Sequence, residues 1–109
     1  MKNKVTLLPA DMYIVVNKSM LNEYDKIVLN MLYMPIIGNT AVTLYNILYS
    51  ELKASNFVSP ELTHHHLMTN LGDSLESIKE ARIKLEGIGL MKTFVKEGSI
   101  NSYVYELYS

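Results

Sequence analysis

The sequence predicts an α+β fold in which helices precede a β-hairpin, and three observations support this prediction. The first is an amphipathic helical pattern over residues 73–87 that ends at glycine. The second is a pair of segments, 90–96 and 103–107, rich in residues that suit a half-buried pleated surface. The third is the turn sequence at 97–101, which contains glycine, serine and asparagine. With further helical patterns upstream, these observations predict a winged helix-turn-helix with extra helices and an N-terminal strand that pairs with the hairpin.

The helix at 73–87 has sequence signals for its start and its end. Asp73 is expected to be the N-cap, with Glu76 reaching back to the first turn. Gly87 is expected to take the left-handed conformation that ends a helix, with Ile88 packing back on the last turn. The side chains expected in the core, because they recur at helical spacing, are Leu75, Ile78, Ala81 and Leu85.

Two elements are expected nearer the N-terminus. Residues 12–16 form a β-prone run, and we expect a strand at the edge of the hairpin because two strands alone are marginally stable. Asn22 can cap a helix that ends near Tyr33, since Pro35 disfavours helical geometry at the residue before it. The buried stripe of that helix would be Tyr24, Ile27, Val28 and Met31.

Two more helices are expected between these elements and residue 73. The first spans about residues 40–54, with Asn39 as its N-cap and an apolar stripe of Ala41, Leu44, Tyr45, Leu48 and Leu52. Residues 55–60 form a loop, and a short helix at 63–71 follows it. A tight turn then leads into the helix at 73–87, which is the spacing of a helix-turn-helix.

Length and composition limit the function. The chain has 109 residues, which suits one domain over 1–109, and its end at a strand suggests an N-terminal fragment of a longer protein. The net charge of −1 argues against strong autonomous binding to a polyanion. The absence of cysteine excludes disulfides and favours a cytoplasmic location. We recognise neither a signal peptide nor a membrane-spanning stretch in the sequence.

Two segments carry a resemblance to a known family. Residues 33–38, Tyr-Met-Pro-Ile-Ile-Gly, and the helix after them are similar to the start of the DnaB/DnaD-type replication initiation proteins of Gram-positive bacteria. Residues 81–94 resemble that family's junction between helix and wing. The likeness spans nearly the whole chain. It is greatest to the amino-terminal domain of the family's helicase-loading and membrane-attachment branch.

The resemblance implies a non-enzymatic role, without a cofactor, in the primosome that initiates or restarts replication. It implies self-association into a dimer or higher oligomer, and contacts with DnaD-type proteins, helicase-loader proteins and the replicative helicase. Membrane association would belong to the full-length protein. The family's second domain carries a Tyr-x-x-x-Ile-x-x-Trp motif linked to single-stranded DNA, and this chain has no tryptophan. DNA contact would therefore be weak here or made by the rest of the protein.

Candidate metal and catalytic chemistry is sparse. His64, His65 and His66 are consecutive, and consecutive helical residues point about 100° apart, so they cannot converge on one ion. A solvated helix face is expected instead, with no metal site. No glycine-rich phosphate loop or Ser-His-Asp motif stands out, so no catalytic residue is assigned.

The helix at 73–87 occupies the position that reads the major groove in helix-turn-helix proteins. Its outward face mixes acidic with basic side chains, and phosphates would repel the acids. A DNA-binding winged helix, such as a transcription regulator, is therefore the alternative function. The candidates for weak phosphate contacts are Lys79, Arg82, Lys84, Lys92 and Lys96.

The favoured function is an assembly module, whose oligomer holds weak sites elsewhere in the protein together. Ile83 lies among charged neighbours on the helical wheel, so either the helix is covered on two sides or Ile83 contacts a partner. Tyrosine and methionine suit contact surfaces, although in this chain they could equally cover the core of the hairpin. The candidate partner or oligomer interface is Ile83, Met12, Tyr13, Tyr103, Tyr105 and Tyr108.

Overall fold

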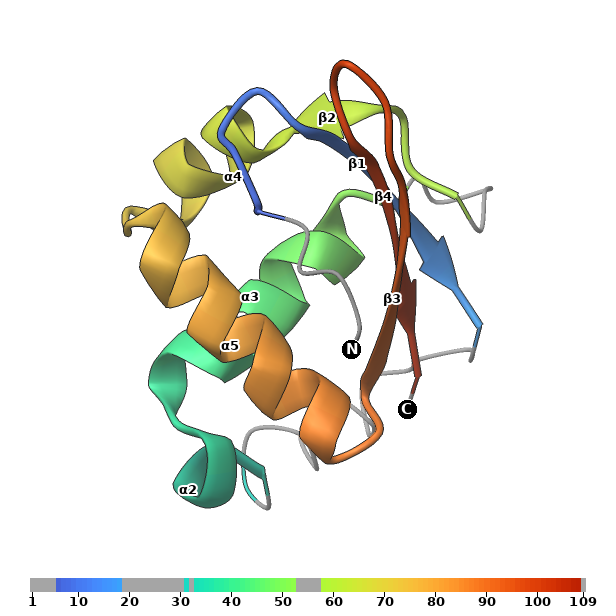
Figure 1. The fold of residues 1–109 in the computed structure, drawn as a ribbon. Helices are drawn as coiled ribbons and strands as arrows, with labels where there is room; N and C mark the ends of the chain where they lie inside the picture. The colour runs from blue at the N-terminus through green and yellow to red at the C-terminus, as the bar shows by residue number, and fades with distance from the viewer. Residues whose placement is uncertain (1–5, 19–30, 32, 53–57, 109) are drawn as a thin grey trace, which may run out of the picture.

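Four helices and four strands make up the part of the chain that the structure, a computed structural model, describes: residues 6–18, 31, 33–52 and 58–108. In chain order they are β1 (Met12–Asn17), α2 (Met34–Ile37), α3 (Asn39–Ser50), β2 (Leu62–Thr63), α4 (His64–Leu71), α5 (Leu75–Gly87), β3 (Met91–Lys96) and β4 (Ser102–Leu107). The helices lie on one side of the sheet (Figure 1). The predicted α+β class and the helix-then-hairpin order at the C-terminus are confirmed.

The sheet has the strand order β2-β1-β4-β3. The hairpin of β3 and β4 is antiparallel, and β1 lies parallel to β4 with Tyr13 opposite Tyr103. The expected N-terminal strand therefore does pair with the hairpin. The short strand β2 pairs antiparallel with β1 and was not predicted, because two residues are too few to show a periodic pattern.

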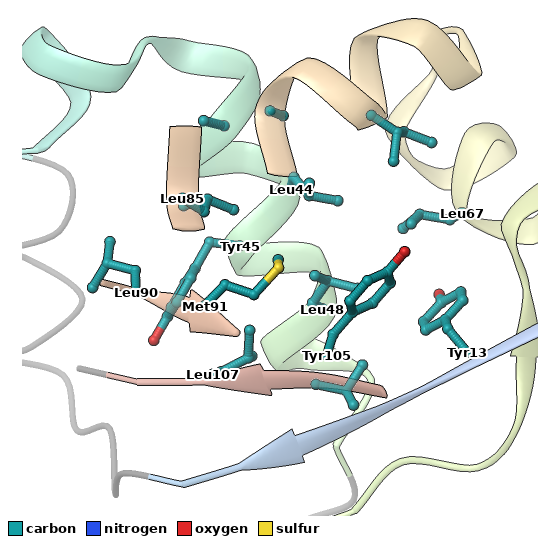
Figure 2. Packing of buried hydrophobic residues seen from close by; sticks show 14 of the residues in the cluster. Tyr13, Leu44, Tyr45, Leu48, Leu67, Leu85, Leu90, Met91, Tyr105 and Leu107 are labelled. Carbon is teal, nitrogen blue, oxygen red and sulfur yellow. The ribbon is translucent and has the colours of Figure 1, made fainter. Parts of the chain in front are cut away.

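The core fills the space between the sheet and the helices. Figure 2 shows Tyr13 and Tyr105 pointing from the strands into the layer of helices, to which Leu85 and Leu67 also contribute. Strand side chains alternate between the two faces, so every second residue of β1 and β4 is buried. The predicted stripes hold for the buried side chains of α3 and α5, which include Ala41, Leu44, Tyr45, Leu48, Ile78, Ala81 and Leu85. Leu52 and Leu75 are partly buried against this core.

Both ends of α5 differ from the prediction. Ser74, not Asp73, is the N-cap: its Oγ accepts from the Ser77 N–H at 3.1 Å, whereas Asp73 Oδ1 accepts from the Ser74 N–H at 2.8 Å. At the other end, Gly87 is the last helical residue, and the left-handed residue is Gly89 with φ of 80°. Because Gly87 and Gly89 are only two residues apart, the sequence was compatible with a left-handed conformation at either glycine.

The junction between α2 and α3 also differs. We expected helical geometry to stop before Met34, but α2 begins there and holds Pro35 in its first turn. Proline is tolerated in that turn because its missing N–H would have no partner inside the helix. Gly38, with φ of 91°, is the N-cap of α3, so Asn39 is a helical residue rather than the cap. Most of the helix expected at 22–33 lies outside the described residues, as do 53–57.

Candidate partner and nucleic-acid interface

The helices α4 and α5 are joined by a tight turn that orients α5. Thr63 caps α4, because its Oγ1 accepts from the His66 N–H at 3.2 Å. Gly72 ends α4 with φ of 70°, a conformation that glycine adopts readily, and its N–H donates to the Met68 carbonyl at 2.8 Å. The chain then enters α5 and continues into the hairpin (Figure 1). The helix-turn-helix and its wing are therefore both present.

The outward face of α5 has both signs of charge. Ile78, Ala81 and Leu85 are buried, so the opposite side of the helix faces solvent. Lys79 Nζ lies 3.9 Å from Glu76 Oε1, which partly neutralises that lysine. Lys84 is exposed and lines a hollow of about 90 Å³ between α3 and α5, together with Glu80. A hollow of this size is smaller than a typical small-molecule pocket.

Arg82 is a correction to the candidate phosphate contacts. Its side chain is only 18% exposed, and its Nε lies 3.5 Å from Glu86 Oε2. Its guanidinium carbon lies 5.8 Å from the centre of the Tyr103 ring. Residues 82 and 86 are one helical turn apart on the side of α5 that faces the wing, so the arginine is used inside the domain rather than offered to a phosphate.

The remaining lysines do not form one patch. Lys92 and Lys96 alternate with buried Met91 along β3, so they lie on the side of the sheet away from the helices. Lys92 Nζ also lies 5.7 Å from the centre of the Tyr108 ring. Lys84 lies on the helical layer, beside α3. The predicted cluster of Arg82 and Lys84 with the wing lysines is therefore wrong, because the sheet separates them.

Of the six candidate interface residues, three belong to the core. Tyr13, Tyr103 and Tyr105 are 1%, 3% and 1% exposed, so they cannot form a surface in this fold. These three tyrosines are buried because side chains alternate along a strand, and the odd-numbered residues of β1 and β4 face the helices. The alternative, that tyrosines cover the core of the hairpin, holds for these three. Met12 and Tyr108 are partly exposed.

Ile83 is exposed, as the helical wheel predicted. Its side chain is 56% accessible and lies opposite the buried face of α5. Sequence reasoning missed other exposed apolar side chains, notably Phe94 at 52% on β3 and Ile36 at 71% on α2. Phe94 stands opposite Val104, which stands opposite Ile14, so an apolar row crosses the outer face of three strands. The alternation within each strand was the signal that could have identified this row.

The histidines on α4 lie in two different environments. His65 and His66 are exposed, but His64 is 0% exposed, so the prediction of a solvated face is wrong for that residue. His64 occupies the same helical face as Leu67 and Leu71, a spacing that could have predicted its burial. Among the described residues, no group of three His, Cys, Asp or Glu side chains could hold a metal ion.

Glu51 is a second ionisable group drawn into the interior. Its Oε1 accepts from the Tyr13 hydroxyl at 2.7 Å, and its side chain is 9% exposed. His66 Nε2 lies 3.5 Å from Glu51 Oε2. Burial raises the pKa of Glu51, against the smaller lowering effects of Tyr13 and His66. This contact joins α3, α4 and β1.

A helix-turn-helix followed by a two-stranded wing defines a winged-helix domain. The chain belongs to the DnaB N-terminal winged helix domain family, whose sequence model matches residues 7–109. The fold and the family indicated by the two sequence segments are therefore confirmed. In the described part of the chain, no helix has the length and apolar character needed to cross a bilayer.

Two relatives extend this comparison. The chain is 36% identical over 102 residues to the replicative helicase loading/DNA remodeling protein DnaB of Staphylococcus aureus (strain NCTC 8325 / PS 47), covering 93% of this chain and 22% of that protein. It is 39% identical, with a TM-score of 0.84, to the crystal structure of primosome protein DnaB (residues 1–300) from Geobacillus stearothermophilus, covering 94% of this chain and 39% of that one. The chain thus spans less than half the length of either relative.

Proposed function

We propose that this domain is a non-enzymatic assembly module of bacterial replication initiation and restart, which helps to load the replicative helicase. The relatives are named for helicase loading and for the primosome, and the present chain corresponds to a minor part of each. The module would act in the cytoplasm by self-association and by binding primosome proteins. The full-length protein would supply DNA contacts and any attachment to a membrane.

The surface of α5 is the observation that carries this proposal. A helix that reads a DNA groove needs a face that phosphates attract, yet Glu76 and Glu80 share the outward face with Lys79. Ile83 lies on the same face at 56% exposure. An apolar side chain within a ring of opposite charges suits a contact between proteins, where charged pairs set the orientation of the partner.

A weak DNA-binding function is the second candidate, and the exposed lysines of the wing favour it. Lys92 and Lys96 lie on one face of β3, on either side of Phe94. Such a surface could contact phosphates, and its affinity should then fall steeply with added salt. The two functions differ in their residues, since the assembly function depends on Ile83 and the DNA function depends on the wing lysines.

Substitution of Ile83 by glutamate tests the assembly function. We expect Ile83→Glu to leave the domain folded, because the side chain already faces water, and to shift sedimentation towards the monomer. The matched control is Leu8→Glu, which places the same charge at a residue with 52% exposure in the segment before β1. Unchanged self-association in Ile83→Glu, or equal loss in both variants, would show that this face of α5 is not the interface.

A further inference from the structure

His64 is held in the core by two hydrogen bonds from different elements. Its Nδ1 lies 2.8 Å from the backbone oxygen of Asp11, and its Nε2 lies 2.6 Å from the hydroxyl of Tyr105. A backbone carbonyl can only accept, so Nδ1 carries the hydrogen. In the neutral ring, Nε2 is then bare and accepts from the Tyr105 O–H. The structure thus defines one tautomer of His64.

The groups around this ring do not favour a positive charge. Tyr13 on β1 and Tyr103 on β4 have ring centres 5.0 and 5.3 Å away from that of His64, so the ring is enclosed by aromatic side chains. Burial lowers the pKa of His64 below its ordinary value, and the like charge of Arg82 on α5 adds the smallest of the effects. Asp11 opposes this shift, but its carboxylate already accepts from the backbone N–H groups of Leu8 and Asn101.

The same histidine anchors the junction of β2 and α4. The His64 backbone N–H also donates to the Asp11 oxygen, at 3.0 Å, and the His65 N–H donates to the Pro9 oxygen at 2.9 Å. Strand β2 pairs with β1 over two residues, Leu62 and Thr63, and the segment before it is held separately by hydrogen bonds between Ser59 and Val15. A junction with so few main-chain contacts depends strongly on the side chain that fastens it.

We propose that His64 is an acid-sensitive latch whose protonation at Nε2 releases the β2–α4 junction from Met12 and Tyr13 of β1. A proton taken from water at Nε2 makes this nitrogen a donor, so the Tyr105 O–H loses its acceptor. The resulting imidazolium is buried among aromatic rings, and the attraction of Asp11 does not offset the cost of burying this charge. Opening the junction lets the ring reach water.

Hydrogen exchange as a function of pH tests the latch. His64 binds its proton more weakly in the closed state than in the open state, so opening becomes more favourable as pH falls below about 6.5. After correction for intrinsic rates, the amides of His64 and His65 should lose protection by up to tenfold per pH unit. The Leu90 amide, which donates to Leu85 O at the end of α5, should keep its protection over the same range.

Two substitutions separate the latch from general acid sensitivity. His64→Gln keeps an amide donor and acceptor but cannot titrate, so the extra opening at low pH should disappear. His65 is an exposed neighbour on the same helix, so the His65→Gln variant should keep the extra opening at low pH. The same acid-induced opening in His64→Gln would contradict the proposal.

Should His64→Gln fail to fold, the ring nitrogens of the unmodified protein decide the question by nuclear magnetic resonance. The latch requires the Nδ1–H tautomer at neutral pH, and it requires protonation of His64 to coincide with the loss of amide protection. A ring that is protonated while the His64 and His65 amides remain protected would overturn the proposal.

Discussion

Arg82 and Glu86 form an ion pair across one turn of α5, with Nε 3.5 Å from Oε2, on the side of the helix that meets the wing. Thr93 on β3 donates a hydrogen bond to the same carboxylate. This contact connects helix and hairpin below the surface that a DNA phosphate would reach. Arg82 is therefore part of the packing between helix and hairpin, whereas Lys84, Lys92 and Lys96 are exposed.

The first prediction follows from that separation. Arg82→Gln should lower the free energy of unfolding by about 1 kcal/mol, since it removes a partly buried ion pair and a cation–aromatic contact. Lys84→Gln, two residues away and exposed, should leave stability nearly unchanged. Urea denaturation measures both variants. Equal stability in the two variants would show that the Arg82 contacts contribute little.

The N-cap of α5 provides a second prediction. Ser74→Ala should cost about 1 kcal/mol of stability, because the Ser77 N–H loses the acceptor that Ser74 Oγ provides. Asp73→Ala should cost less, since its carboxylate accepts from the neighbouring Ser74 amide and from the Ser77 side chain, but from no backbone N–H inside the helix that the structure shows. Thermal unfolding of the two single variants ranks them. The reverse order would mean that Asp73 acts as the cap in solution.

The two glycines after Leu85 should respond to alanine with opposite signs. Gly89 has φ of 80°, so Gly89→Ala should destabilise the domain by about 1 kcal/mol although the space beside it is open. Gly87 is helical and also open, so Gly87→Ala should be neutral or stabilise by up to about 1 kcal/mol. Chemical denaturation of both variants tests the pair. A destabilised Gly87→Ala variant would show that residue 87 adopts the left-handed conformation.

Glu51 should make the domain less stable as pH rises. Burial raises its folded-state pKa above the ordinary value of 4.5. The unfolding free energy should therefore fall between pH 4.5 and the raised pKa, and the loss should be complete above that pKa. Glu51→Gln keeps an acceptor for the Tyr13 hydroxyl and should remove this dependence, with a gain of about 1 kcal/mol at pH 8.

A matched control for Glu51 is the exposed residue Glu61. Glu61→Gln should reproduce the pH dependence of the unmodified protein, because it leaves the buried Glu51 carboxylate and its Tyr13 contact in place. The measurement is the urea midpoint at a series of pH values. A Glu51→Gln variant that is less stable at pH 8 would show that the hydrogen bond from Tyr13 to the charged carboxylate outweighs the cost of burying the charge.

Local patterns were sufficient to locate α3, α4, α5 and the hairpin, but not α2. The spacing of Ile78, Ala81 and Leu85 identified α5, and the turn at 97–101 separated the strands that became β3 and β4. These features depend on residues a few positions apart, which interact through the helical and pleated repeats themselves. The same reasoning correctly left Ile83 outside the core.

The contacts that the sequence did not reveal join distant segments. His64 meets Asp11 across 53 residues and Tyr105 across 41, so no local pattern could pair them. The burial of Tyr13 and Tyr105 likewise depends on which face of each strand meets the helices, and this is decided by the register of β1 with β4. Arg82 looked like a phosphate contact because its partner Tyr103 lies on another element.

Sedimentation of the unmodified domain at rising concentration, read beside its binding to a short DNA duplex at low salt, tests the central claim most directly. The account predicts a concentration-dependent oligomer and no tight duplex complex, because the exposed face of α5 has both signs of charge around Ile83. A strictly monomeric domain that binds the duplex tightly, with an affinity that falls steeply in salt, would contradict it.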